Sequence, residues 1–283
     1  MPNTLDIRRR IRSVKNTQQI TRAMKMVAAA KLRRAQESIV AARPYSGALQ
    51  VVLSSVATRV DPEQHPLLRE REEKRVLIVV VTGDKGLCGA FNTKIVTSTQ
   101  REIAVRDWES VQLIPIGRKG ADFFKRRDIP IRHQAVNVFQ ALAPETAKAL
   151  AKLIVDDYVE EKIDAVYVVY NEFRSVIMQI VRFEKLLPLT RAEVEEPTVD
   201  YLYEPSPDEI LRNLLPKYVE FQVYRTLLDS AAAEQGARMT AMEAATRNAG
   251  DMIDSLTLTY NRARQAAITK EIIEIVSGAA ALE

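Results

Sequence analysis

The chain is poor in the residues on which many enzyme sites are built. It has 283 residues but one cysteine, Cys88, and two histidines, His65 and His133. A single cysteine excludes a disulfide within the chain and is typical of a reducing compartment. With so little histidine and cysteine, we expect no metal site, no cofactor and no histidine-based catalysis.

Long apolar runs are also absent. Charged residues make up 28% of the chain, and no apolar stretch approaches the roughly 20 residues that a membrane helix needs. The basic residues from Arg8 to Arg12 are not followed by a continuous apolar segment, so we expect no signal peptide. The sequence predicts no direct membrane insertion.

Proline and glycine are nearly missing from both ends. Neither occurs between residues 3 and 43, and no proline occurs between residues 217 and 283, whereas ten of the 12 prolines lie between residues 62 and 216. This distribution predicts a long helix in residues 1–60 and another in residues 207–283, on either side of a punctuated middle. At ~1.5 Å per residue the last helix would be roughly 100 Å long, so it needs a partner helix.

Apolar spacing indicates that the two terminal helices pair as an antiparallel coiled coil. In the first helix the apolar residues step by fours and threes, but the stripe slips in its middle: Ile7, Ile11, Val14; Ile20, Met24, Val27; Ala28, Leu32, Ala35, Ile39. The last helix has a similar series, in which Thr246 fills a gap: Leu228, Ala231, Gln235, Met239, Met242, Ala249, Ile253, Leu256, Tyr260, Ala263, Ala267. We therefore expect an irregular supercoil, a kink rather than an end at Pro44, and Met24 near Tyr260.

The middle of the chain alternates between two kinds of pattern. Strand patterns cover residues 75–82, 111–116, 163–170 and 176–187, and helix patterns cover residues 91–106, 119–127 and 144–161. This alternation predicts a Rossmann-like, mostly parallel α/β domain in residues 74–200. The fold class is therefore α/β, a central α/β domain joined to a long two-helix coiled coil.

A glycine-rich turn, TGDKGLCGAFN, follows the first strand. Its glycines, Gly83, Gly86 and Gly89, are spaced G-x-x-G-x-x-G, and Lys85 precedes Gly86 instead of following it. Neither the dinucleotide fingerprint nor the P-loop has this spacing. We expect a tight turn and close helix packing, with nucleotide binding by the turn as the alternative. For Cys88 we expect a packed, unreactive side chain.

Acidic pairs occupy the end of the helix expected at residues 144–161. They are Asp156 with Asp157 and Glu160 with Glu161, and we interpret them as a solvated helix face rather than a metal or acid–base site. Ser206 and Pro207 instead form a helix-start signal, a capping residue followed by proline at the first position. No catalytic constellation remains in the sequence.

The charge is unevenly distributed. The net charge of the chain is +4, yet residues 1–43 contain eleven Lys or Arg against two acidic residues. This basic segment is either the solvated face of a helix or a surface for an anionic partner. A coiled coil that binds nucleic acid is therefore an alternative function, although aromatic residues are not interleaved with the basic ones.

The last residues of the chain are apolar on every side of a helix. In YNRARQAAITKEIIEIVSGAAALE the apolar residues from Ala266 to Leu282 point in nearly every direction, and the given sequence supplies no further segment to cover them. A soluble helix normally keeps one polar face. We therefore expect other chains to surround this tail.

Several motifs together resemble the gamma subunit of F-type ATP synthases. They are IRSVKNTQQITRAMKMVAAAKLRRAQ from Ile11, DKGLCGAFN from Asp84, KLLPL from Lys185, YLYEPSP from Tyr201, and RMTAMEAATRNAGDMI with YNRARQAAITKEIIEIVSGAAAL near the end. The resemblance covers essentially the whole chain. It implies a non-catalytic central rotor shaft that transmits torque between a proton-driven c-ring and a catalytic ring of alpha and beta subunits.

The resemblance also implies partners and contact residues. The expected partners are three alpha and three beta subunits, an epsilon subunit and the c-ring, on the cytoplasmic face of the cell membrane. Matching the motifs residue by residue assigns contact with an acidic loop of beta to Arg22, Met24, Lys25, Arg264, Gln265 and Thr269. It assigns the apolar collar of the ring to Ile272, Ile275, Val276 and Leu282, and contact with the c-ring and epsilon to Tyr201, Tyr203 and Glu204.

Overall fold

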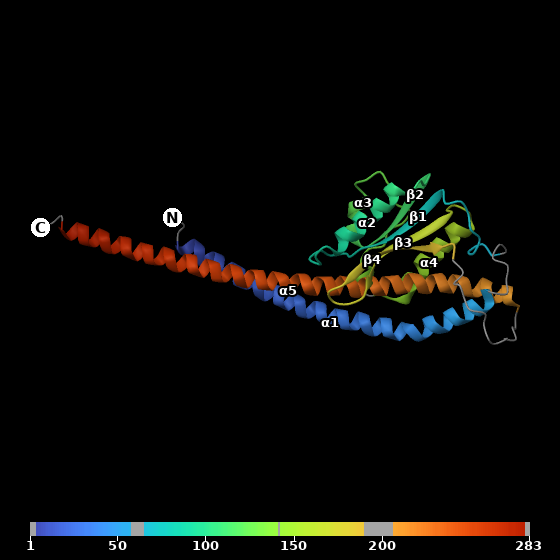
Figure 1. Cartoon of the computed structure of the whole chain (residues 1–283), viewed down its shortest axis with the longest axis horizontal. Helices are drawn as coiled ribbons and strands as arrows, with labels where there is room; N and C mark the ends of the chain where they lie inside the picture. Colours follow the sequence, from blue (N-terminus) through green and yellow to red (C-terminus); the bar gives the residue numbers. More distant parts are fainter. Residues whose placement is uncertain (1–3, 58–64, 141, 190–205, 281–283) are drawn as a thin grey trace. The chain divides into compact units, whose positions relative to one another are not determined.

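The computed structural model of the chain describes residues 4–57, 65–140, 142–189 and 206–280. It consists of two compact units. One unit contains Met1–Ala28 with Met239–Glu283, and the other contains Ala29–Arg238. Two long helices run through both units, α1 over Thr4–Ala57 and α5 over Pro207–Ala280 (Figure 1).

The boundaries of the long helices follow the punctuation of the sequence. Helix α5 begins at Pro207, where the fixed φ of proline suits the first helical position. Ser206 precedes it, and its carbonyl oxygen accepts the first helical bond from the Ile210 amide at 3.1 Å. Helix α1 continues through Pro44, as expected.

The larger unit contains a four-stranded sheet in the order β2-β1-β3-β4. The strands are β1 (Arg75–Val81), β2 (Ser110–Ile116), β3 (Ala165–Phe173) and β4 (Gln179–Leu187). Strand β1 is parallel to both β2 and β3, and β4 joins the edge of β3 antiparallel. The mostly parallel α/β class predicted from the sequence is confirmed.

Several expected element boundaries in this unit are corrected by the structure. Strand β3 covers Ala165–Phe173 rather than residues 163–170, and helix α4 covers Pro144–Val159 rather than residues 144–161. Strand β4 begins at Gln179 rather than residue 176, because Ser175 turns the chain and its amide donates to the Met178 carbonyl at 3.0 Å. The short helix after β2 ends at Phe124 rather than residue 127.

Helices cover both faces of the sheet. The sheet lies between α2 (Phe91–Val105) with α3 (Arg118–Phe124) on one side and α4 (Pro144–Val159) on the other (Figure 1). The short 3-10 helix η2 covers Val138–Gln140. Side chains of β1 alternate between the two cores, so that six consecutive residues of this strand are buried.

Helix α5 completes both cores. Its apolar residues Leu211, Leu215, Val219, Val223 and Leu227 are fully or almost fully buried on the side of α4. About two to three turns later, Ala233 and Ala237 join the core that α2 forms with the opposite face of the sheet. The first part of α5 is therefore an integral element of the α/β unit.

Candidate functional site

In the smaller unit the paired helices contact each other along a regular stripe. On α1 the residues at this stripe are buried or half-buried and follow an unbroken heptad: Ile7, Ile11, Val14, Gln18, Thr21, Lys25, Ala28. On α5 they are Met242, Thr246, Ala249, Ile253, Leu256, Tyr260 and Ala263. Steps of four and three along both helices are the spacing of a coiled coil.

The predicted slip in the α1 stripe is wrong. Ile20 and Val27 are 59% and 55% exposed, so they lie outside the contact. Gln18 and Thr21 take the core positions instead, and their polar groups are satisfied across the helix pair. The Thr21 hydroxyl lies 2.8 Å from that of Thr246, and the Gln18 amide donates to the Thr246 carbonyl oxygen at 3.4 Å.

These cross-helix contacts fix an antiparallel register. Lys25 Nζ lies 3.1 Å from a carboxylate oxygen of Glu243, and the Arg8 guanidinium donates to the Tyr260 hydroxyl and lies over its ring. The expectation that Met24 lies near Tyr260 is therefore wrong, because the residue opposite Tyr260 is Arg8. Antiparallel pairing itself is confirmed.

The residues expected to contact beta are consequently at two levels of the coiled coil. Arg22 is exposed and Met24 half-buried, and Lys25 pairs with Glu243. Arg264, Gln265 and Thr269 are exposed on α5, and Arg264 lies about 30 Å along the helix from Glu243. The two groups would have lain at one height if Met24 were near Tyr260, and in the structure they do not.

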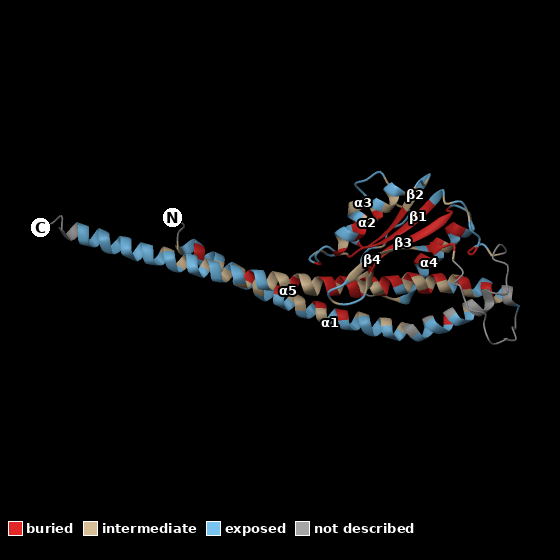
Figure 2. Ribbon diagram, viewed as in Figure 1, coloured by how far each residue is buried: buried red, intermediate tan, exposed pale blue. Residues whose placement is uncertain are grey.

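Beyond Ala263 every described residue of α5 up to Ser277 is exposed. This segment is uniformly pale blue in Figure 2. It includes Ile272 at 55%, Ile275 at 71% and Val276 at 62% exposed. Leu282, the fourth expected collar residue, lies outside the described residues. A helical segment with large apolar side chains exposed on several faces is a surface for other chains.

The glycine-rich turn is held by hydrogen bonds within the chain. The Gly83 amide donates to Asn92 Oδ1 at 2.8 Å, and Asp84 Oδ1 accepts from the amides of Arg118 and Asn137. Leu87 and Gly89 both have φ near +60°, which gives the tight turn predicted from the glycine spacing.

Cys88 is buried, as expected, with 1% exposure. Burial raises the pKa of its thiol, and the negative charge of Glu234 raises it further. A buried thiol with a raised pKa is a poor nucleophile at neutral pH.

At the end of α4, Asp156, Glu160 and Glu161 are exposed, as expected of a solvated face, but Asp157 is not. Asp157 is 4% exposed, and its two carboxylate oxygens each accept a 2.9 Å hydrogen bond from Arg132. These hydrogen bonds lower the pKa of Asp157. No group of three or more potential metal ligands occurs among the described residues.

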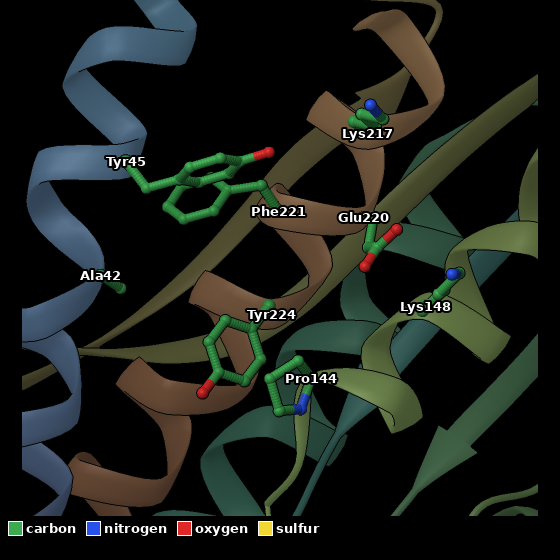
Figure 3. Close-up of a pocket in the computed structure, with 8 residues that line it drawn as sticks. All are labelled: Ala42, Tyr45, Pro144, Lys148, Lys217, Glu220, Phe221 and Tyr224. Carbon is green, nitrogen blue, oxygen red and sulfur yellow. The ribbon is translucent and has the colours of Figure 1, made fainter. Parts of the chain in front are cut away.

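A hollow of about 460 Å³ lies between α1, α4 and α5 in the larger unit. Phe221 and Tyr45 contact each other at one side, with ring centroids 5.6 Å apart, and Tyr224 lies below them (Figure 3). The eight lining residues include no histidine, cysteine or carboxylate pair: Ala42, Tyr45, Pro144, Lys148, Lys217, Glu220, Phe221 and Tyr224. The hollow therefore offers apolar packing and lysine charge, but no set of catalytic groups.

Comparison with known proteins identifies the family. A sequence model of the ATP synthase family matches residues 3–282. An ATP synthase gamma chain of Solibacter usitatus is 53% identical over 287 residues, and one of Pelotomaculum thermopropionicum is 49% identical over 285, both with 100% of each chain covered. The chain belongs to the ATP synthase gamma chain family.

Solved structures agree with this assignment of the gamma chain. A chain of the central stalk and c-ring of the Tetrahymena thermophila mitochondrial ATP synthase is 29% identical, with a TM-score of 0.62 over 80% of this chain and 99% of that chain. A chain of the Euglena gracilis enzyme has a TM-score of 0.70 over 99% and 94% of the two chains, and at 19% identity it shows the fold alone.

Two further observations concern the gamma chain as a subunit. Across the described helices, none is long and apolar enough to cross a membrane. Tyr201, Tyr203 and Glu204, expected at the contact with the c-ring and epsilon, lie outside the described residues.

Sequence reasoning missed the polar core of the gamma chain coiled coil. Gln18, Thr21 and Lys25 were not placed in the stripe, because only apolar residues were counted on the first helix. The signal that could have found them is the unbroken heptad spacing itself, which continues from Val14 to Ala28 if polar residues are allowed at core positions.

Proposed function

We propose that this gamma chain is the central rotor shaft of an F-type ATP synthase. Its coiled coil would turn inside a ring of three alpha and three beta subunits, driven by the c-ring during ATP synthesis and by ATP hydrolysis in reverse. The observation that carries the proposal is the α5 segment beyond Ala263, which no described residue of the chain covers.

The exposed segment fits an apolar collar. Burying a side chain such as Ile275 or Val276 stabilises an assembly by roughly 1.5–3 kcal/mol, so several of them hold the end of α5 firmly in a sleeve. Apolar contact has no preferred direction, which suits a helix that turns within its sleeve. Ile272 and Leu282 complete the proposed collar contact.

Polar residues would supply the directional contact with beta. Arg264, Gln265 and Thr269 would donate hydrogen bonds to an acidic beta loop at one level of the shaft, and a carboxylate acceptor makes each of these bonds charge-assisted. Arg22 with Met24 and Lys25 would act at a second level. Because Lys25 already pairs with Glu243, it would have to share its charge with that carboxylate.

The remaining assignments concern the domains of gamma and its place in the complex. We assign residues 1–60 and 207–283 to the shaft and residues 74–200 to an α/β foot. Tyr201, Tyr203 and Glu204, which follow the foot in the sequence, would contact epsilon and the c-ring. Catalysis would belong to beta, and gamma itself would be non-catalytic. The complex would hold gamma at the cytoplasmic face of the cell membrane as a peripheral subunit.

The structure gives less support to the nucleic-acid alternative. Part of the positive charge of α1 is engaged within the chain, since Arg8 contacts Tyr260, Lys25 pairs with Glu243 and Arg33 pairs with Glu37. The same engagement reduces the number of cations free to contact phosphates.

The proposal is tested by co-expression with alpha and beta subunits of a bacterial ATP synthase. The full chain is expected to co-purify with them as a complex that hydrolyses ATP and to drive rotation of an attached bead. A chain ending at Ala263 is expected to assemble poorly. Absence of any complex, together with salt-dependent DNA binding by the free chain, would favour the nucleic-acid alternative.

A further inference from the structure

Glu234 is a buried carboxylate on α5. It lies neither in the stripe between the paired helices nor in the exposed end of α5, so neither feature explains it. Its exposure is 4%, and its carboxylate forms an ion pair with Arg238 one turn later on α5 at 2.5 Å. Both side chains are nearly inaccessible, at 5% and 12% exposure. A charged pair with so little access to water needs a structural reason, because desolvation is costly.

The pair lies directly against the glycine-rich turn. A Cβ atom built on Gly83 would lie 2.9 Å from the Glu234 carboxylate, so the carboxylate would have to move to make room for it. Arg238 Nη2 donates to the Gly86 carbonyl oxygen at 3.3 Å. The spacing of the glycines is therefore explained in part by α5, since Gly83 leaves room for a carboxylate that comes from another element.

Both sides of this contact are rigid. The turn is fixed by Asn92 and Asp84, which accept hydrogen bonds from the Gly83, Arg118 and Asn137 amides. On α5, Ala233 and Ala237 are packed in the core beside the sheet. Gly236 allows Phe173 to approach α5 closely, because a Cβ atom built on Gly236 would lie 3.3 Å from a ring carbon of Phe173.

We propose that Glu234 and Arg238 are positioning residues that fasten α5 to the carboxyl edge of the sheet, so that the α/β domain and the helix turn as one body. This inference rests on the proposed rotor function. The apolar residues of α5 from Leu211 to Ala237 already pack in the α/β unit, and Arg238 is the last residue of α5 in that unit. Because α5 continues without interruption past Arg238, this pair would hold the end of the packed segment when torque is transmitted. The carboxylate also fills a place beside the turn that an anion would need, which disfavours the nucleotide-binding alternative.

The accessibility of Cys88 reports whether the glycine-rich turn stays packed against α5. Cys88 is the one cysteine of the chain, it lies in the same turn, and it is 1% exposed. In Arg238→Met the loss of the cation would raise the pKa of the thiol and slow its chemical reaction, because Arg238 lowers that pKa. Faster modification of Cys88 in this variant could then arise only from opening of the turn.

The first experiment measures Cys88 modification by a maleimide in the folded full chain. Arg238→Met is expected to raise the rate at least about fivefold, as local opening becomes easier. The matched control is Glu37→Gln, which removes the exposed ion pair between Arg33 and Glu37 with the same i,i+4 spacing and leaves the rate unchanged. An unchanged rate in Arg238→Met would overturn the proposal.

The second experiment tests transmission in the assembled complex. A bead is attached to the α/β domain through Arg126→Cys in a Cys88→Ala background, and its rotary fluctuations are recorded with nucleotide-locked beta subunits. Arg238→Met is expected to widen these fluctuations while the maximal ATP hydrolysis rate stays within about twofold. Equal fluctuation widths in the variant and the wild type would overturn the proposal.

A third pair of variants covers the case in which Arg238→Met does not fold. Gly83→Ala is expected to lower the unfolding temperature, because the Glu234 carboxylate must move away from Arg238. Gly83→Ala with Glu234→Ala is expected to lose less than the sum of the two single variants, because the clashing carboxylate is gone. Additive losses would contradict the contact. Failure of the chain to assemble with alpha and beta would refute the rotor function alone, since the labelling and stability experiments use the free chain.

Discussion

The hydroxyls of Thr21 and Thr246 lie 2.8 Å apart and share a hydrogen bond between the two paired helices. Thr21 is 8% exposed, so this is a buried polar contact within the stripe between the helices. Each hydroxyl also lies near a carbonyl of its own helix, that of Gln18 at 3.0 Å and that of Met242 at 2.7 Å. Buried polar positions of this kind specify register in coiled coils, at some cost in stability.

Replacing Thr21 and Thr246 by valine is expected to show that the two residues are energetically coupled. Thr21→Val or Thr246→Val alone leaves one hydroxyl without its cross-helix partner and should cost about 1 kcal/mol. The double variant should lose little more than either single variant, because all three chains lack the same cross-helix hydrogen bond. Denaturant unfolding of the four chains gives the coupling free energy, and additivity within about 0.3 kcal/mol would contradict the shared hydrogen bond.

Disulfide formation is expected to report the register directly. In a Cys88→Ala background, Thr21→Cys with Thr246→Cys should form a disulfide, because the present hydroxyl oxygens are already close. Thr21→Cys with Tyr260→Cys is the matched control. Its second position lies about 20 Å further along α5, so it should not cross-link. The reverse outcome would restore the register that we first expected.

Elements of this fold were predictable where a local pattern decides them. The apolar run of β1 and the Ser206-Pro207 start of α5 are local signals, and both were found at the expected residues. The register of the coiled coil is not a local property. It depends on where the chain turns back between the helices, so apolar spacing alone misplaced Met24 relative to Tyr260.

Buried charges were the second class of features that sequence could not give. Asp157 sits beside three other acidic residues in the sequence, which is typical of a solvated face. Its burial depends on Arg132, which approaches from a different segment of the α/β domain. Glu234 is likewise explained only by Gly83, which lies far away in sequence.

Asp229 is expected to make stability depend on pH. Burial raises the pKa of Asp229 to about 6. The positive charges of Arg225 and Arg174 lower this pKa, and the negative charges of Glu172 and Glu184 raise it further. Between about pH 4 and pH 6, Asp229 is therefore protonated in the folded state but ionised in the unfolded state. Stability should fall as pH rises through this window and remain lower above it.

Asp229→Asn removes this penalty. It should stabilise the chain by about 2 kcal/mol at pH 8, with the gain vanishing below about pH 4. Asp157→Asn is a control of opposite sign, because hydrogen bonds from Arg132 lower the pKa of Asp157. That variant should lose stability at pH 8 and lose less as pH falls. Urea unfolding across pH checks both, and parallel behaviour of the two variants would refute the assignment.

Charge in the exposed end of α5 is expected to prevent assembly. Ile275→Asp with Val276→Asp would place two unpaired carboxylates in the proposed collar, where each costs several kcal/mol. The matched control is Ile177→Asp with Met178→Asp, which alters two exposed apolar residues at the β3–β4 turn, 87% and 54% exposed. Complex formation with alpha and beta should fail only for the first pair. Normal assembly of that pair would contradict a buried collar.

Arg264 and Gln265 are expected to control coupling. Both are exposed on α5 beyond the last residue of the paired stripe, so their donors are available to a partner. With an acidic beta loop, each charge-assisted hydrogen bond would contribute about 1.5–3 kcal/mol, strong enough to hold one orientation and weak enough to be broken at every step. Arg264→Ala with Gln265→Ala should therefore lower ATP synthesis and multisite hydrolysis, while nucleotide binding at a single beta site is unchanged.

Ionic strength separates this electrostatic contact from a purely structural effect. Salt screens exposed charges, so the difference between Arg264→Ala with Gln265→Ala and the wild type should shrink as salt rises. Arg262→Ala is the matched control, since it removes an exposed arginine two residues away on another side of the helix. It should leave coupling nearly unchanged. Equal losses in Arg262→Ala, or a salt-independent loss in the first variant, would show that net charge or helix stability acts here instead of a directed contact.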